Sequence, residues 1–159
     1  MKNENYYTKR NIHDIDRIGE LLEELPSFCE DYFLGVESRT SSQTRLKYAY
    51  DLRIFFDFLC KRRYRNLAAT DLTLAHLQAI THNDIELFLS YLSHYRFNGK
   101  SLSCDERAKA RKLSAVRAMF KYFFNKGMID VDNAAKVPTP KLHDKEIIRL
   151  DAGEVSELI

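Results

Sequence analysis

The sequence has few of the residues that punctuate a β-rich fold. Its 159 residues include five Gly and three Pro, whereas a fold of many short strands needs a turn signal about every eight to twelve residues. With 45% hydrophobic residues, among them ten Phe and nine Tyr, the chain can bury enough apolar surface to fold without disulfides. We therefore expect an all-α fold of one domain with at most a short appendage at either end.

Long apolar runs are also missing. The longest stretch without Asp, Glu, Lys or Arg is Leu72 to Asn83, twelve residues, against roughly eighteen or more for a membrane span. Residues 1–10 are too polar for a secretory signal. Cys29, Cys60 and Cys104 are widely spaced and form no Cys-x-x-Cys pair. These features predict a cytoplasmic protein with reduced thiols and no membrane partner.

Motifs for nucleotide, metal or nucleophilic chemistry do not occur in the sequence. The five isolated Gly cannot form either of the Gly-rich phosphate-binding loops. There is no His-Glu-x-x-His and no Gly-x-Ser-x-Gly. The five His lie in unrelated contexts, and a lone His needs oriented partners to act as a base. We therefore expect no cofactor, no metal and no small-molecule substrate.

The net charge of +2 is the sum of segments with opposite signs. Residues 39–65 hold eight basic and two acidic residues, and residues 96–126 hold nine basic and two acidic residues. Residues 1–38, by contrast, hold four basic and nine acidic residues. Two segments thus contain seventeen of the twenty-five cations, which favours one basic face that binds a polyanion. Two solvated helix faces are the alternative.

Apolar spacing predicts a short leading helix within residues 1–25 and four core helices within residues 26–136. Ile15, Ile18, Leu22 and Leu25 give the leading helix an apolar side, and Pro26 ends it. The first core helix should run from residue 26 to about 36, and the second from hydroxyl caps at 41–44 to about 63. The buried stripe of the second is predicted to be Tyr48, Leu52, Phe55, Phe56 and Leu59.

Two patterns of Ser or Thr followed by an acid predict the starts of the other core helices. Thr81 with Asp84 resembles a capping box, and Ser103 with Glu106 matches one in full. The last helix should run to residue 126 and stop at Gly127. Its buried stripe is predicted to be Leu113, Val116, Phe120, Phe123 and Phe124.

The C-terminal residues have the composition of a linker. Pro138 and Pro140 interrupt a polar stretch suited to an extended chain. Asp151 and Glu154 then begin a helical pattern of about two turns, too short to be stable alone. We expect residues 137–159 to be an interdomain linker followed by the truncated start of a second domain.

Four patches in order resemble the N-terminal domain of tyrosine recombinases, in the phage-integrase and Xer-type branch. The pattern T-x-x-x-Y-x-x-D-L-x-x-F-x-x-F-L at residues 44–59 resembles that domain's second helix. The pattern A-R-K-L-S-A-V-R-x-x-F-x-Y at residues 110–122 resembles its fourth. Residues 129–141 resemble the family's linker, with Ala134 in place of the usual Pro, and residues 150–155 resemble the opening of its catalytic domain.

The resemblance implies a four-helix core-binding (SAM-like) domain that grips a recombination site in double-stranded DNA, for integration or excision, together with other recombinase protomers. In this family a separate catalytic domain supplies an Arg, a Lys, a His-x-x-Arg, a further His or Trp, and a Tyr nucleophile. No His here is followed by Arg three residues later. We therefore expect the chain to lack the catalytic residues and to be inactive alone. The first 25 residues are too few and too acidic for an arm-binding domain.

Eleven residues of the two basic segments are the candidate DNA contacts. The start of the second core helix should present hydroxyls and charge to phosphates. The exposed side of the fourth should lie along the major groove, where Arg can read guanine. Three lysines should supply unspecific attraction. The set is Ser42, Thr44, Arg45, Lys47, Tyr48, Arg107, Lys109, Arg111, Lys112, Ser114 and Lys121.

Two other functions stay open from the sequence. A free-standing helical DNA-binding regulator would show the same basic face. A protein-interaction module would use the aromatic stripes to bind a partner helix, although stripes at helical spacing more often fill a core. Binding to duplex DNA at low salt separates the module from the two DNA-binding functions.

Overall fold

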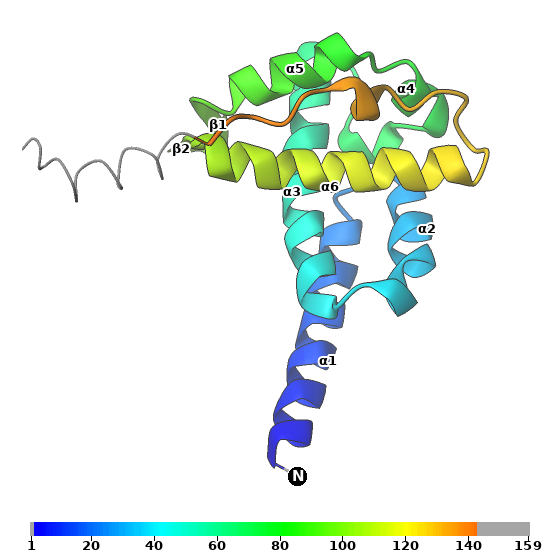
Figure 1. The fold of residues 1–159 in the computed structure, drawn as a ribbon, viewed down its shortest axis with the longest axis vertical. Coiled ribbons are helices and arrows are strands. Elements are labelled where there is room, and N and C mark those ends of the chain that lie inside the picture. Colours follow the sequence, from blue (N-terminus) through cyan, green and yellow to red (C-terminus); the bar gives the residue numbers. More distant parts are fainter. Residues whose placement is uncertain (1, 143–159) are drawn as a thin grey trace, which may run out of the picture.

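The computed structural model describes residues 2–142 (Figure 1). The all-α prediction is confirmed, since these residues are mostly helical and the four expected core helices are α2, α3, α5 and α6. None of the helices within these residues is both long and apolar enough to cross a membrane. The elements are α1 (Lys2–Leu22), α2 (Phe28–Gly35), α3 (Ser42–Arg62), α4 (Leu74–Gln78), α5 (His82–Tyr91), β1 (Tyr95–Phe97), β2 (Lys100–Leu102) and α6 (Glu106–Asn125).

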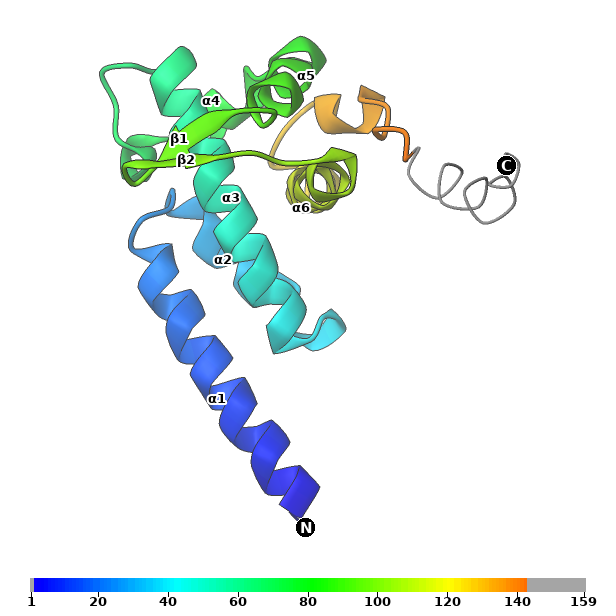
Figure 2. The same ribbon diagram turned by 90° about the vertical axis from the view of Figure 1, so that its left-hand side faces the viewer.

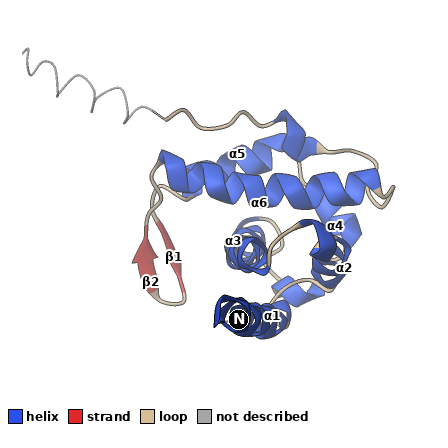
Figure 3. Cartoon of the chain, turned by 60° about the horizontal axis from the view of Figure 1, so that its bottom comes forward, coloured by secondary structure: helices blue, strands red, loops and turns tan. Residues whose placement is uncertain are grey.

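Two long helices organise the body. α6 lies across the middle of α3 (Figure 1), and α5 lies beside α6 (Figure 3). α1 runs along the opposite side of α3 and extends past its first residue (Figure 2). Ser42, at the start of α3, donates a hydrogen bond to Asn11 at 2.8 Å and to Asp14 at 3.0 Å. The N-terminal turns of α1 therefore project beyond the body.

Aromatic side chains join the four core helices. The ring of Phe28 lies edge to face with Phe56, at a centroid distance of 5.7 Å, and with Phe123 at 5.5 Å. Phe55 packs on Phe88 of α5 at 5.1 Å. Such pairs add about 0.5–1.5 kcal/mol each beyond the area they bury. The predicted stripe of α3 is thus buried in the core, except for Tyr48, which is half-buried.

The leading helix is longer than predicted and turns a different side to the core. It begins at Lys2, and Asp14, Ile18 and Leu21 are buried, while Ile15 is 46% exposed. Asp14 shares this side because it accepts a hydrogen bond from Ser42. The prediction of an apolar side through Ile15 was therefore wrong, because a polar residue occupies one of the core-facing positions.

The two predicted capping boxes had different outcomes. The side chain of Thr81 accepts from the amide of Asp84, and the box at α5 is confirmed. At α6, however, Asp105 is the cap, and its carboxylate accepts from the amide of Ala108 at 2.8 Å. Ser103 lies before the helix because the chain is still leaving β2 there.

Along α6, the buried stripe differs from the prediction at one position. Leu113, Val116, Phe120 and Phe123 are buried as expected, whereas Phe124 is 44% exposed. Ala115 and Met119 are also buried in the core. Gly127 has a φ of +72°, a conformation that suits the residue after a helix.

A hairpin between α5 and α6 had not been predicted. β1 and β2 are antiparallel, and Tyr95 lies opposite Leu102. Asn98 and Gly99 both have positive φ, 51° and 77°, as a two-residue hairpin turn of type I′ requires. Tyr95 is buried, and Phe97 lies 4.8 Å below the guanidinium of Arg53 in α3, so the hairpin is anchored to the body.

Candidate nucleic-acid interface

Two shallow hollows meet where α3 and α6 cross. One, of about 380 Å³, is lined by residues of both helices, including Lys47, Arg111 and Ser114. The other, of about 300 Å³, is lined by residues that include Thr44 and Lys121. Tyr48 lines both hollows, so together they form one continuous surface. We call the residues of these two hollows the α3–α6 surface.

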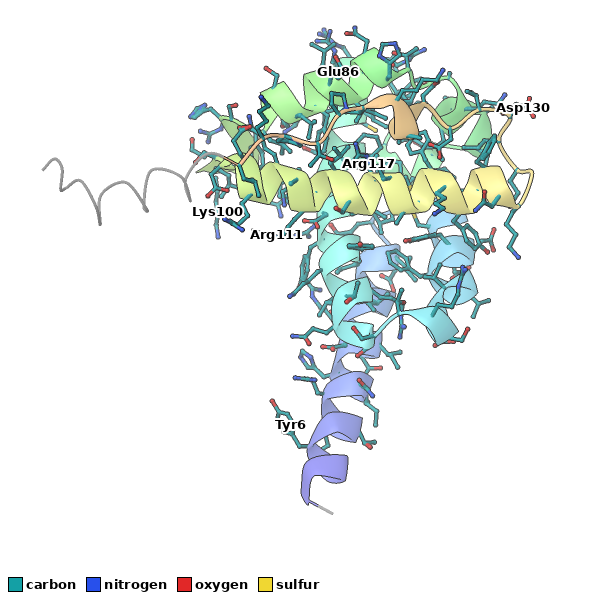
Figure 4. The ribbon with its side chains drawn as sticks, in the orientation of Figure 1. Tyr6, Glu86, Lys100, Arg111, Arg117 and Asp130 are labelled. Atoms are coloured by element: carbon teal, nitrogen blue, oxygen red, sulfur yellow. The ribbon has the colours of Figure 1, made fainter. Side chains whose placement is uncertain are left out.

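Three of the predicted cations on this surface have no counter-charge within the described residues. Lys47, Arg111 and Lys121 are exposed, and their side chains make no hydrogen bond or ion pair within the described residues. Figure 4 shows Arg111 on the side of α6 away from α5. A ligand that carries negative charge can therefore pair with all three without breaking an internal bond.

Lys112 and Asp51 are the exception within the surface. The ammonium nitrogen of Lys112 lies 2.8 Å from a carboxylate oxygen of Asp51, and each side chain is 15% exposed. This pair ties α6 to α3 at their crossing. Lys112 thus adds less net charge to the surface than its exposed neighbours.

Hydroxyl groups lie between the cations. Ser114 is exposed, and its hydroxyl donates to the carbonyl of Ala110 at 3.1 Å. The amide of Thr44 donates to the hydroxyl of Ser41, the cap of α3. Tyr32 forms part of the wall, and its phenol is neutral near pH 7, as any tyrosine phenol is; burial raises its pKa further. The surface therefore combines positive charge with neutral hydrogen-bonding groups.

Two of the predicted contacts are instead buried within the body. Ser42 is 6% exposed and bonded to α1, and Arg45 is 7% exposed. One guanidinium nitrogen of Arg45 donates to the carbonyls of Glu37 at 2.9 Å and of Thr40 at 2.5 Å. Arg45 thus holds the connection between α2 and α3, whereas Ser42 holds α1 against α3. Neither residue lines the α3–α6 surface.

The two remaining predicted residues lie at the start of α6. Lys109 turns toward the end of α5, where it donates to the hydroxyl of Ser93 at 2.7 Å, and its side chain is 12% exposed. Arg107 is exposed one turn before Arg111, on the same side of the helix. Arg107 can therefore extend the α3–α6 surface, whereas Lys109 cannot without leaving Ser93.

Sequence reasoning missed several residues of the surface. Arg39, Thr40 and Asn125 line the second hollow. Arg39 belongs to the basic segment, so its charge was a signal. Its place beside α6, however, depends on how the chain turns between α2 and α3.

The chemistry of the surface suits an anion. Among residues 2–142, no group of three His, Cys, Asp or Glu side chains is close enough to hold a metal ion. The surface offers Lys and Arg side chains with hydroxyls beside them. Such a set is typical of sites that contact phosphates of a nucleic-acid backbone.

Comparison with known proteins agrees with this fold. The chain is 29% identical over 138 residues to tyrosine recombinase XerC of Caldanaerobacter subterraneus subsp. tengcongensis, covering 81% of this chain and 37% of the relative. It is 31% identical over 136 residues to tyrosine recombinase XerC of Natranaerobius thermophilus, covering 86% of this chain and 40% of the relative. The chain thus spans about two fifths of the length of these curated relatives.

No solved structure gives a significant match to this chain. The profile of the family described as phage integrase, N-terminal SAM-like domain, matches residues 29–127. This match runs from α2 to the end of α6 and includes every helix of the α3–α6 surface. It covers well over half of the chain, which therefore belongs to the phage integrase N-terminal SAM-like domain family.

Proposed function

We propose that the α3–α6 surface binds double-stranded DNA and that the chain is the core-binding domain of a site-specific tyrosine recombinase. The observation that carries this proposal is the set of three exposed, unpaired cations on two crossing helices: Lys47, Arg111 and Lys121. The DNA would be a recombination site at which integration or excision takes place.

The shape of α6 supports contact with a DNA groove. Arg111 and Lys121 are ten residues apart, which is about 15 Å along a helix. Between them lie Ser114 and Ala118, whose small side chains let a groove wall approach the helix. The two cations would then contact separate phosphates or base edges, while Lys47 of α3 contacts the backbone.

The contact set that we propose is smaller than the one expected from the sequence. Ser42 and Arg45 are left out because they are buried, and Lys109 is left out because it turns away from the surface to Ser93. The proposed contacts are Thr44, Lys47, Tyr48, Arg107, Arg111, Lys112, Ser114 and Lys121.

The recombinase part of the proposal rests on the family and on the relatives, which are named tyrosine recombinase XerC. We propose that strand cleavage requires a catalytic domain beyond the described residues, and that other protomers join on paired sites in the cytoplasm. We retain the division into a leading segment (1–25), a DNA-binding domain (26–136) and a linker with the start of a catalytic domain (137–159).

The burial of Phe55, Phe56 and Phe123 argues against a protein-interaction module that would offer its aromatic stripes to a partner helix.

Fluorescence anisotropy with a mixed duplex of roughly 30 base pairs tests the DNA-binding proposal across a salt series. Replacing Arg111 and Lys121 by Ala should weaken binding and reduce the salt slope by about two units, because two phosphate contacts are lost. The matched control replaces Lys9 and Lys136 by Ala, since both are exposed and outside the surface. Equal weakening by the two double variants would contradict a specific role for the α3–α6 surface.

A further inference from the structure

A second group of cations lies at the other end of α3. Lys61, Arg62, Arg63 and Arg65 are half of the eight cations in residues 39–65, and the α3–α6 surface contains none of them. With Phe58 and two residues of α5, they line a hollow of about 480 Å³. We call it the α3–α5 hollow.

The two basic regions are separate. Arg62 follows Tyr48 by fourteen residues, which is about 21 Å along the helix. α6 crosses α3 between them, and the end of α3 lies behind α5 (Figure 1). A ligand on the α3–α6 surface therefore leaves the α3–α5 hollow open.

Two of the four cations already have partners that fix the walls of the hollow. Lys61 donates to the carbonyl of Arg96 at 2.8 Å and lies 2.9 Å from a carboxylate oxygen of Asp57. Arg63 lies 2.6 Å from a carboxylate oxygen of Asp84. The carboxylate in the wall, that of Asp84, is thus neutralised within the chain.

The other two cations are available. Arg62 and Arg65 are exposed, and neither side chain has a hydrogen bond or ion pair within the described residues. The helix dipole favours cations near the C-terminal end of a helix, but this effect is limited to the last turn. Arg65 lies beyond the end of α3, so the dipole does not explain its place in this cluster.

Guanidinium groups bind phosphate through two parallel hydrogen bonds, which makes Arg the preferred residue for nucleic-acid backbones. We propose that the α3–α5 hollow binds the phosphate backbone of a second DNA duplex, so that one chain joins two duplexes. This inference rests on the proposed function for the first duplex, which occupies the α3–α6 surface. Arg62 and Arg65 make the phosphate contacts, and Lys61 and Arg63 hold the hollow in shape.

A bridging assay tests the inference on the full chain. One duplex is immobilised and saturated with the chain at low salt, and capture of a second, fluorescent duplex is measured. Replacing Arg62 and Arg65 by Ala should leave binding of the first duplex unchanged and lower capture of the second by about tenfold. The control variant again replaces Lys9 and Lys136 by Ala, which removes the same charge from other places.

Each result has one meaning. Capture that falls with the Arg62 and Arg65 changes, and persists in the control, supports the inference. Binding of one duplex without capture of a second by the unchanged chain overturns it and leaves the proposed function intact. Capture that survives both changes also overturns it, because two chains in contact would then join the duplexes. Failure to bind even the first duplex overturns the proposed function itself.

Discussion

The ammonium nitrogen of Lys112 lies 2.8 Å from a carboxylate oxygen of Asp51, which joins the two helices that carry the basic surface. Both side chains are 15% exposed, so solvent screens the pair less than it screens an exposed pair. Asp51 thus stabilises the crossing of α3 and α6, while it lowers the positive charge that the α3–α6 surface offers to DNA.

Replacing Asp51 by Asn should therefore have opposite effects on stability and on binding. The free energy of unfolding should fall by about 1–3 kcal/mol, because Lys112 loses its counter-charge in a partly buried place. DNA affinity at low salt should rise, because the surface gains one net positive charge. Urea unfolding and fluorescence anisotropy measure the two effects.

Asp57→Asn is the control for that variant. Asp57 pairs with Lys61, whose side chain is 48% exposed, and such a pair contributes about 0–1 kcal/mol. We expect a smaller loss of stability and no gain in affinity for the first duplex. Weaker DNA binding by Asp51→Asn would show that the position of Lys112 matters more than its charge.

Arg45 and Lys47 should show contrasting behaviour when each is replaced by Ala. Arg45→Ala leaves the carbonyls of Glu37 and Thr40 without their buried donor, and should cost about 2 kcal/mol of unfolding free energy. DNA affinity of the folded chain should stay the same. Lys47→Ala should leave the free energy of unfolding unchanged and lower the DNA affinity, since Lys47 is exposed and has no partner among the described residues. If Arg45→Ala bound DNA more weakly than the unchanged chain under conditions in which both are fully folded, Arg45 would belong to the interface.

The position of Arg45 shows what can and what cannot be predicted from the sequence. The aromatic stripe of α3 was predictable because Leu52, Phe56 and Leu59 repeat at helical spacing. Arg45 stands in the same register, seven residues before Leu52, and this spacing was a signal of burial. Charge composition masked the signal, because a basic segment shows how many cations it holds but not which side of the helix carries each one.

Other features depend on contacts between distant segments. The pairing of Lys112 with Asp51 requires α6 to lie across α3, and the pairing of Lys109 with Ser93 requires the hairpin to return the chain to the end of α5. No local pattern indicates either arrangement. The hairpin had a local signal in the Asn98–Gly99 turn. Its strands have three residues each, too few for an alternating pattern to be evident.

Arg117 is expected to fix the path of the chain after α6. It lies on the side of α6 that faces the segment after residue 130 (Figure 4), and it donates to the hydroxyl of Thr139 at 2.7 Å and to the carbonyl of Val137. Arg117→Ala should speed tryptic cleavage after Lys136 or Lys141, with no change in DNA affinity. Thr139→Val removes one of these bonds and should have a smaller effect. Equal cleavage rates in all three proteins would show that other contacts hold the segment.

Stability should fall at alkaline pH because of buried phenol and thiol groups. Burial raises the pKa of Tyr95 from 10.0 to about 12, with a smaller effect from Cys104 beside it. Burial likewise raises the pKa of Tyr32 and of Cys29 above their usual ranges. Because each group holds its proton more tightly in the folded state, its contribution is fully present below the unfolded pKa and is lost as pH rises through the folded one.

The free energy of unfolding should therefore stay level to about pH 8 and fall from about pH 9 upward, first through the thiol of Cys29 and then through the phenols. Changing both Tyr32 and Tyr95 to Phe keeps the rings in the core and removes the ionisable hydroxyls, so the drop should become shallower. Tyr6→Phe is the control, because Tyr6 is 59% exposed and lies outside the core. Urea unfolding at stepped pH measures the slope. An identical slope in the unchanged chain and the double variant would assign the alkaline loss to groups other than these tyrosines.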